Sequence, residues 1–364
     1  MDKKITDFIV TELKIGRWML APIDLLLFAA APVFAFMMRS SVASYTCMDT
    51  ESYIRMSDGL KILTGCFDLL LAIVCAMLVY EMTAHKIKAF LAYAIILMLP
   101  VLCAGCAMWG MGDSVYVFFA VFSLYLLMRG KGNAAVMVYG ISLFLNRYAF
   151  FLLPIYAICF MQKKAKLAAY LVPLCGAWFR NGIMNGDGYC IFPIFEAEKL
   201  FTQSRGETLL SFHWPNLFQM IGPDKFVAEY SVAAKILAAT LMLCIVVAAI
   251  MRRRELTKQN IVTAALAMSV LFPFIMPQMD ERCGLMADVL IVVFAMQHME
   301  MAYLAVAQIV ISYMAYSAYF RGESVVPLCY VALAELCILL VLLCFAGSGK
   351  RPVFTLMKKE QNND

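Results

Sequence analysis

The chain has 364 residues, of which 63% are hydrophobic and 15% charged, and its mean hydropathy is +0.81. Soluble domains average about 25% charged residues, so this composition excludes an ordinary soluble globular protein. The formal net charge of +5 is divided among short loops, which argues against a nucleic-acid-binding surface. Several mostly apolar runs are long enough to cross a bilayer core roughly 30 Å thick. The composition predicts an all-α, polytopic integral membrane protein.

The predicted elements begin with residues 1–16, which we expect to form an amphipathic helix on the membrane surface. The apolar run from Trp18 to Met38 is longer than the hydrophobic region of a cleavable signal peptide, so it is predicted to remain as the first span. About twelve spans are expected, within a range of about ten to twelve. The predicted spans are 17–38, 61–82, 89–108, 114–128, 133–147, 149–162, 167–180, 231–251, 260–276, 284–300, 301–320 and 325–346.

The segment 133–162 is the least regular of these elements. A helix of fifteen residues rises only about 22 Å, which is short for a full crossing. Basic loops lie on both sides of the segment, so an even number of crossings is required between them. We therefore expect a hairpin of two short helices, with a re-entrant element as the alternative.

Lysine and arginine recur in alternate short loops, for example at Lys86 and Lys88, at Lys163 and Lys164, and at 252–254. The positive-inside rule makes these loops cytoplasmic and places both termini in the cytoplasm. We expect one transmembrane domain over residues 1–364, with a cytoplasmic tail at 348–364. Two long outer loops are predicted, at about 39–60 and about 181–230.

Polar clusters gather on the predicted outer side. A solvated loop is the simpler interpretation of any single cluster, but several of these turns are very short and flanked by apolar residues. Arg147 lies between two apolar half-helices and needs an anionic partner, either a protein carboxylate or a ligand phosphate. The clusters contain Asp49 and Asp58; Trp109, Asp113 and Tyr116; Asn146 and Arg147; His213, Trp214 and Asn216; and Asp280, Glu281 and Arg282.

Other charged residues lie singly within the predicted spans, where each is expected to form a structural ion pair or a snorkelling end. The sequence has no Walker A, HExxH or GxSxG motif, so NTP-driven transport and serine hydrolysis have no support. The single intramembrane charges are Asp24, Asp68, Lys235, Asp288, Glu300 and Glu335.

Taken in order, the outer clusters resemble the bacterial GT-C membrane glycosyltransferases, in particular the mannosyltransferase-like group that uses polyprenyl-phosphate sugars. Asp49 and Asp58 have the family's spacing of two first-loop acids, with Met56 where an aromatic residue is usual. The stretch WGMGDSVY at 109–116 is similar to the family's WGQxDxxY-like turn, with Met111 in place of Gln. The stretch WPNLF at 214–218 is similar to a PNxW/Y turn.

The family's PxMHERY motif is similar to PQMDERC at 277–283, where Asp280 replaces His and Cys283 replaces Tyr. An ADVL-like helix start follows at 287–290. The matching stretches cover residues 49 to 290 in the family's order. The departures at Met111, Asp280 and Cys283 bear on specificity and activity.

The resemblance implies an inverting hexosyl transfer from a polyprenyl-phosphate sugar to a lipid-linked or cell-envelope glycan acceptor, on the outer face of the bacterial cytoplasmic membrane. It implies Asp49 as general base. Arg282 and Arg147 would bind the donor phosphate, with Glu281 holding Arg282 in place. Supporting or sugar- and acceptor-binding roles fall to Asp58, Trp109, Asp113, Tyr116, Asn146, His213, Trp214, Asn216, Asp280 and Glu281.

The sequence indicates no specific cofactor, and the carboxylates leave a divalent metal ion open. The expected partners are the lipid-phosphate sugar donor, a glycan or glycolipid acceptor and the bilayer itself. A lipid-linked glycan flippase or transporter is the main alternative, and it predicts polar residues at the membrane midplane and internal repeats. A polysaccharide polymerase, with a long outer loop and catalytic arginines, is a nearer alternative.

Overall fold

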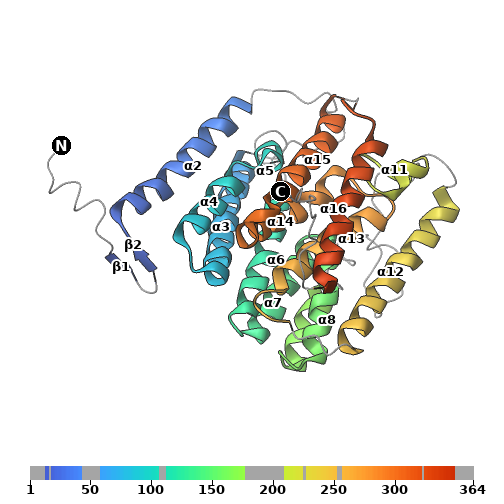
Figure 1. Cartoon of the computed structure of the whole chain (residues 1–364), viewed down its shortest axis with the longest axis horizontal. Coiled ribbons are helices and arrows are strands. Elements are labelled where there is room, and N and C mark those ends of the chain that lie inside the picture. The colour runs from blue at the N-terminus through green and yellow to red at the C-terminus, as the bar shows by residue number, and fades with distance from the viewer. Residues whose placement is uncertain are drawn as a thin grey trace, which may run out of the picture.

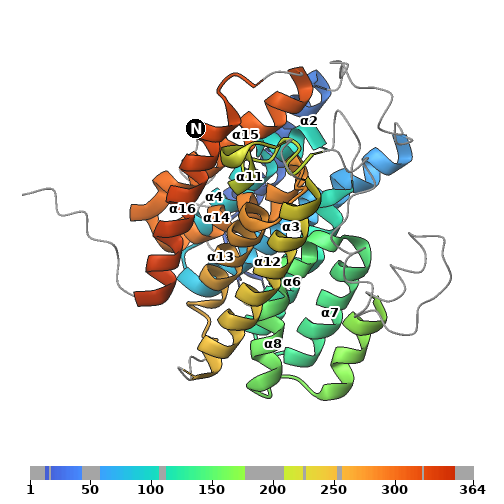
Figure 2. The same cartoon turned by 90° about the vertical axis from the view of Figure 1, so that its right-hand side faces the viewer.

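The computed structural model describes residues 13–15, 18–42, 58–105, 112–176, 209–223, 227–251, 256–321 and 324–348. Apart from one two-stranded hairpin, the regular structure in these ranges is helical, which confirms the predicted all-α class. Figure 1 shows the helices packed side by side, with α2 (Pro22–Val42) at one edge and α12 (Val227–Met251) at the other. Figure 2 shows the same helices from the α12 side.

Most of the predicted spans coincide with helical elements. The helices differ greatly in length, and several are preceded or followed by short 3₁₀ helices (η). The elements are β1 (Leu13–Ile15), β2 (Trp18–Leu20), α3 (Asp58–Thr83), α4 (Lys86–Leu97), α5 (Pro100–Ala104), α6 (Asp113–Met128), α7 (Gly132–Leu145), η2 (Arg147–Leu152), α8 (Leu153–Met161), η3 (Leu167–Tyr170), α11 (Leu217–Ile221), α13 (Ile261–Ile275), η4 (Glu281–Gly284), α14 (Leu285–Gln297), η5 (Met299–Met301), α15 (Ala302–Arg321) and α16 (Leu328–Ser348).

Among the described residues, five helices are long and apolar enough to cross a membrane. This finding supports a membrane protein, whereas the expected number of about twelve spans is not confirmed. Shorter apolar helices account for most of the difference, since α6, α7 and α13 have 16, 14 and 15 residues. The long ones lie at Pro22–Ser41, Ile62–Thr83, Tyr230–Ala249, Met299–Ala318 and Leu328–Gly347.

The start of the chain differs from the prediction. Leu13–Ile15 pairs with Trp18–Leu20 as an antiparallel hairpin. The predicted surface helix over residues 1–16 is therefore wrong at residues 13–15, and the first span does not begin at residue 17. Residues 1–12 lie outside the described ranges. The first helix begins at Pro22 because proline fixes a helical φ and needs no hydrogen bond from its missing N–H at that position. The Asp24 carboxylate accepts a hydrogen bond from the Ala21 N–H (2.9 Å), so this acid belongs to the helix start.

The predicted span 89–108 is not one continuous helix. Helix α4 ends at Leu97, and α5 begins at Pro100. Proline disfavours helical geometry in the residue before it, and Leu99 accordingly has an extended ψ of 125°. Pro100 therefore divides the predicted span into two helices.

The segment 133–162 forms a pair of short helical elements joined at Asn146. The rings of Tyr139 on α7 and Tyr156 on α8 stack with centroids 3.8 Å apart, and the Tyr139 hydroxyl donates to the Ala149 carbonyl oxygen (3.1 Å). The two halves therefore lie against each other, as expected for a helical hairpin. The joint of this hairpin carries Asn146 and Arg147.

Helices α13 and α14 form the centre of the molecule. Every residue of α14 from Leu285 to Met296 is buried, and nearly all of α13 is buried as well. A helix that is apolar on all sides is typical of such a surrounded position. One hydrophobic core runs through the packed helices from Ala31 to Leu342. The loop between α13 and α14 is thereby held among several helix ends.

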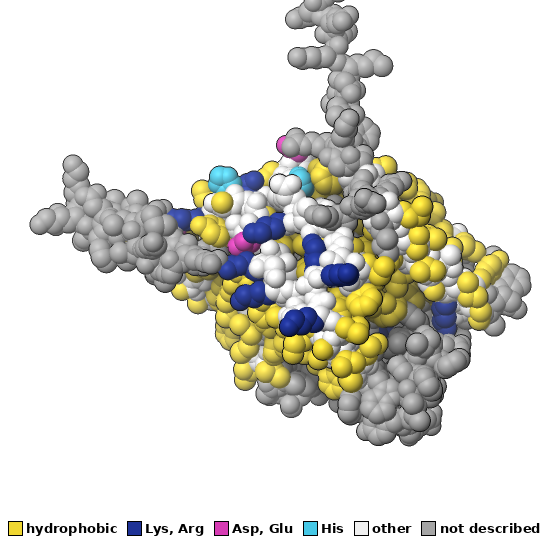
Figure 3. Space-filling view, turned by 90° about the horizontal axis from the view of Figure 1, so that it is seen from below, with side chains coloured by type: hydrophobic (Ala, Val, Ile, Leu, Met, Phe, Trp, Pro, Cys, Tyr) yellow, Lys and Arg dark blue, Asp and Glu magenta, His cyan; other side chains and the backbone are white. Residues whose placement is uncertain are grey.

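Contacts between loops define one basic end of the bundle. The Glu81 carboxylate forms ion pairs with Lys258 (Nζ to Oε1, 2.7 Å) and with Arg129 (Nη1 to Oε2, 3.4 Å). Lys164 donates to the Leu256 carbonyl oxygen. Figure 3 shows lysine and arginine side chains gathered on the face seen from below. These loops are the predicted cytoplasmic ones; their orientation across a membrane stays a prediction.

Candidate functional site

The loop between α13 and α14 places Asp280 and Glu281 inside the protein. The chain leaves α13 at Met276, passes Gln278 in a left-handed conformation (φ 58°) and enters the turn η4. The Asp280 side chain caps this turn by accepting a hydrogen bond from the Arg282 N–H (3.3 Å). Both acids are 0% exposed, so each needs compensation for the loss of water.

Arg282 compensates Asp280. Its Nε and one Nη donate to Asp280 Oδ2 at 3.0 and 2.8 Å, while the Tyr148 hydroxyl donates to Oδ1 at 2.8 Å. Burial alone would raise the pKa of Asp280, but Arg282, Tyr148 and Arg147 outweigh it and lower that pKa. Burial likewise opposes the charge of Arg282, yet Asp280 and Asp113 raise the pKa of Arg282. The group that holds Arg282 by direct bonds is thus Asp280, not the Glu281 carboxylate assigned by the sequence.

The joint between α7 and η2 brings three predicted residues to the same place. Asn146 Nδ2 donates to Asp113 Oδ1 (3.1 Å), and Asn146 Oδ1 accepts from the Tyr148 N–H (3.0 Å). The Arg147 guanidinium lies over the Tyr148 ring, 5.3 Å from its centroid. Asn146 therefore fixes both the start of η2 and the direction of Asp113.

Asp113 links this joint to the Asp280–Arg282 pair. It precedes the predicted span 114–128 and interacts electrostatically with Arg282, Asp280 and Glu281. Burial, reinforced by the two neighbouring acids, raises the pKa of Asp113 to about 6, although Arg282 acts in the opposite direction. Tyr116, one turn further along α6, is buried and lies near Asp113, Tyr148 and Asp280.

The segment 209–216 covers the loop from the other side. His213 Nδ1 lies 3.5 Å from Glu281 Oε2, and the His213 side chain is 34% exposed whereas that of Glu281 is buried. Trp214 packs on Gly284 so closely that a Cβ there would fall 2.1 Å from the indole ring. Asn216 caps α11 by accepting from the Phe218 and Gln219 N–H groups, and donates to the Met276 carbonyl oxygen (3.3 Å).

Trp214 and Asn216 are therefore positioning residues that attach this segment to the loop, and His213 is the member that reaches solvent. We define the polar cluster as the group that meets here: Asp113, Asn146, Arg147, Tyr148, His213, Asp280, Glu281 and Arg282.

Three predicted site residues cannot be assigned to this cluster. Asp49 and Trp109 lie outside the described residues, and Asp58 is described only as the first residue of α3. Two participants were missed by the sequence: Tyr148, which follows Arg147 directly, and Tyr316 on α15, which interacts electrostatically with Asp113 and Glu281. Tyr148 was visible as the neighbour of an intramembrane arginine, whereas Tyr316 has no local signal.

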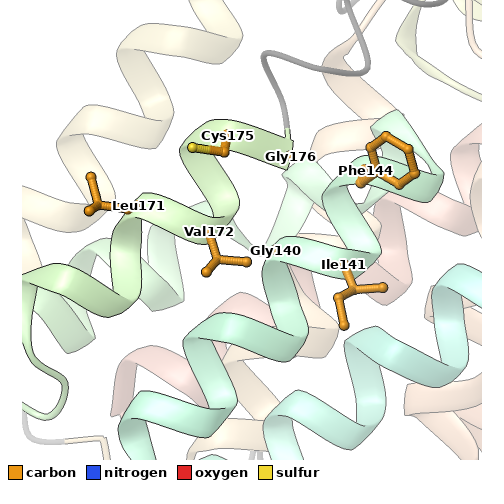
Figure 4. A pocket seen from close by; sticks show the side chains of 7 residues that line it. All are labelled: Gly140, Ile141, Phe144, Leu171, Val172, Cys175 and Gly176. Atoms are coloured by element: carbon orange, nitrogen blue, oxygen red, sulfur yellow. The ribbon is translucent and has the colours of Figure 1, made fainter.

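An apolar groove of about 480 Å³ lies beside the joint, between α7 and the helical segment Leu167–Gly176. Figure 4 shows side chains from both helices around it. The backbones approach closely there, since a Cβ on Gly140 would lie 2.7 Å from the Pro173 nitrogen. Phe144, in the groove wall, is two residues from Asn146, so the groove extends to the end of α7 that leads into the joint.

Within the described ranges, which omit Asp49, no group of three or more His, Cys, Asp or Glu side chains could hold a metal ion. Compared with known protein families and characterised proteins, the chain matches none. The resemblance to GT-C enzymes is therefore carried by the motif residues alone.

Proposed function

We propose that the chain is a GT-C-type membrane glycosyltransferase that transfers a mannose-like hexose from a polyprenyl-phosphate sugar to a glycan or glycolipid acceptor. The observation that supports this most is the meeting of Arg147 and Arg282 in one polar cluster with Asp113, Asp280 and Glu281. These residues come from three separate stretches of sequence, and two of them, 109–116 and 277–283, carry the family-like motifs.

The arginines would serve the leaving phosphate. In the proposed reaction an acceptor hydroxyl attacks the anomeric carbon, the new C–O bond forms, and the bond to the phosphate oxygen breaks with its electron pair. Two cations stabilise that developing charge best when they are already oriented. Asp280 fixes the plane of Arg282, and Tyr148 supports Arg147 from below its guanidinium. Asp280, in place of the family's His, thus acts as a positioning residue.

The acids and the histidine would handle the hydroxyl groups. Asn146 holds the Asp113 carboxylate, and His213 lies beside Glu281. These side chains offer the hydrogen-bond acceptors and donors that orient sugar hydroxyls. The proton of the attacking hydroxyl goes to Asp49, a role that rests on the family resemblance. The apolar groove next to the joint offers an isoprenoid chain a surface of matching chemistry.

The proposed place of action is the outer face of a bacterial cytoplasmic membrane, with both termini in the cytoplasm. The test incubates the purified full-length protein with a panel of polyprenyl-phosphate sugars and measures released polyprenyl phosphate. We expect release by the wild type and none by Asp49→Asn. Glu51→Gln changes a carboxylate of the same loop and is the matched control; it should keep the wild-type rate. Full activity of Asp49→Asn would refute the base assignment.

A flippase or transporter remains the second candidate because the helix interior contains buried acids, which transport proteins use. It predicts movement of the intact lipid-linked sugar between leaflets of a vesicle. Release of polyprenyl phosphate without such movement would exclude it. A polymerase would instead produce glycans of increasing length in the same assay.

A further inference from the structure

A second polar group, distinct from the polar cluster, lies within the helix bundle. It consists of Asp288 on α14, Gln308 and Ser312 on α15, and Glu335 on α16, all 0% exposed. Helices α14 and α16 both pack against α15 (Figure 1). Gln308 and Glu335 lie well inside two of the helices long enough to cross a membrane. Asp288 and Glu335 stand singly in their sequence segments, and the structure brings them close enough to interact with each other.

Short contacts tie the four side chains together. The Ser312 hydroxyl donates to Asp288 Oδ1 (2.6 Å), and the Gln308 amide nitrogen donates to Glu335 Oε1 (3.4 Å). The Gln308 side chain also interacts with the Asp288 carboxyl, so it lies between the two acids.

Neither acid has a basic partner among the described residues. Helices α11 and α13, which pack on α16, carry no ionisable side chain. The titratable neighbour is the Cys283 thiol of η4, which interacts with both acids and with Asp280 and Glu281. On α15, Tyr316 faces the polar cluster. Two buried carboxylates that interact with each other strongly disfavour ionisation of both when no cation compensates them.

The hydrogen bonds of this group leave some of its buried oxygen atoms without a donor. Three buried oxygens here accept no hydrogen bond from any described group: Gln308 Oε1, Asp288 Oδ2 and Glu335 Oε2. An unsatisfied buried acceptor is costly, and three in one place point to absent donors or an absent cation. A protonated carboxyl supplies an O–H donor and removes a charge at the same time.

We propose that Asp288 and Glu335 form a proton-binding site inside the helix bundle, with a proton of the acid pair donated to the side-chain oxygen of Gln308. The ligand is a proton and not a metal ion, because the pair offers only two acids, each already engaged by a neutral donor on its other oxygen. The polar cluster differs, since its buried acid Asp280 is neutralised by arginine. This inference is independent of the proposed sugar transfer.

The test is infrared difference spectroscopy on the purified full-length protein at pH 7, comparing the wild type with the double variant Asp288→Asn/Glu335→Gln. Both substitutions keep the side-chain shape. We expect the wild type minus variant spectrum to contain a protonated-carboxyl C=O band that shifts in D₂O. Glu300→Gln, which removes an exposed carboxyl on η5, should leave that band unchanged. A difference spectrum with ionised carboxylate bands alone would overturn the proposal.

A second measurement excludes a metal cation and does not depend on the double variant. The Tm of the wild-type protein is measured at equal ionic strength in sodium, potassium and choline chloride. We expect the same Tm in the three salts. A Tm that rises with sodium or potassium, and that loses this rise in Asp288→Asn or Glu335→Gln, would assign a metal cation to the pair and overturn the proton site. If the double variant does not fold, the same two single variants provide the infrared comparison.

Discussion

The polar cluster and the inner acid pair answer the same physical problem in two ways. In the cluster, Asp280 is buried but receives two bonds from Arg282 and one from Tyr148, and a lowered pKa keeps it ionised. In the inner pair, Asp288 and Glu335 have only neutral donors, a serine hydroxyl and a glutamine amide. The neighbours of a buried carboxylate, and not its burial alone, therefore decide whether it serves as an anion or binds a proton.

The largest effect should follow when the arginine is removed from the polar cluster. Arg282→Ala leaves the Asp280 charge buried without its guanidinium, which costs about 3–5 kcal/mol of stability. Thermal unfolding of the purified protein measures the loss. Adding Asp280→Asn to Arg282→Ala should recover much of it. An Arg282→Ala protein as stable as the wild type would show that the pair is not an energetic unit.

A smaller loss is expected when the inner pair is truncated. Glu335→Ala deletes the acceptor of Gln308 and leaves a cavity, which should cost about 2–4 kcal/mol. Glu335→Gln preserves volume and polarity and should lie within about 1 kcal/mol of the wild type if the acid is normally neutral. A Glu335→Gln protein as unstable as Glu335→Ala would contradict the neutral state.

The contact between Trp214 and Gly284 tests whether the 209–216 segment is fixed to the cluster. Gly284→Ala places a methyl group against the indole ring, so we expect a loss of about 1–3 kcal/mol and weaker protection of that segment in hydrogen exchange. Gly105→Ala is the matched control, because a Cβ there meets nothing within 4 Å. Equal stability of the two variants would argue against the contact.

A further effect concerns pH. Because the pKa of Asp113 is raised to about 6 by burial, the folded state holds its proton more tightly than the unfolded state does. This group therefore contributes stability below about pH 4 that is lost as pH rises through about 6. The free energy of unfolding of Asp113→Asn, measured from pH 4 to 7, should fall less than that of the wild type over this range. An identical pH profile in the two proteins would show that Asp113 has an ordinary pKa.

The sequence predicted where the helices lie, because apolar runs and basic loops are local signals. It missed the break before Pro100 and the β1–β2 hairpin, where turn chemistry overrides hydrophobicity. It also predicted that Asn146, Arg147 and Asp280–Arg282 lie on one side, and the structure brings them together.

Pairing between helices could not be read from the sequence. Nothing local indicates that Asp288 and Glu335, more than one helix apart, lie near each other, or that Tyr316 approaches Asp113. The same holds for Arg39 and Asp68, which form an ion pair (3.0 Å) between α2 and α3. For Trp214 and Asn216 the sequence left binding and supporting roles open, because motif resemblance does not distinguish a contact with substrate from a contact that positions a loop.

The most direct test of the proposed reaction compares two arginines at opposite ends of the bundle. Arg147→Gln removes a cation from the polar cluster, whereas Arg129→Gln removes one from the basic end, where it pairs with Glu81. The measurement is the rate at which polyprenyl phosphate is released from a polyprenyl-phosphate mannose donor. We expect a fall of about 10²–10³-fold for Arg147→Gln and an unchanged rate for Arg129→Gln. Equal rates in the two variants, or no release by the wild type from any sugar donor, would contradict it.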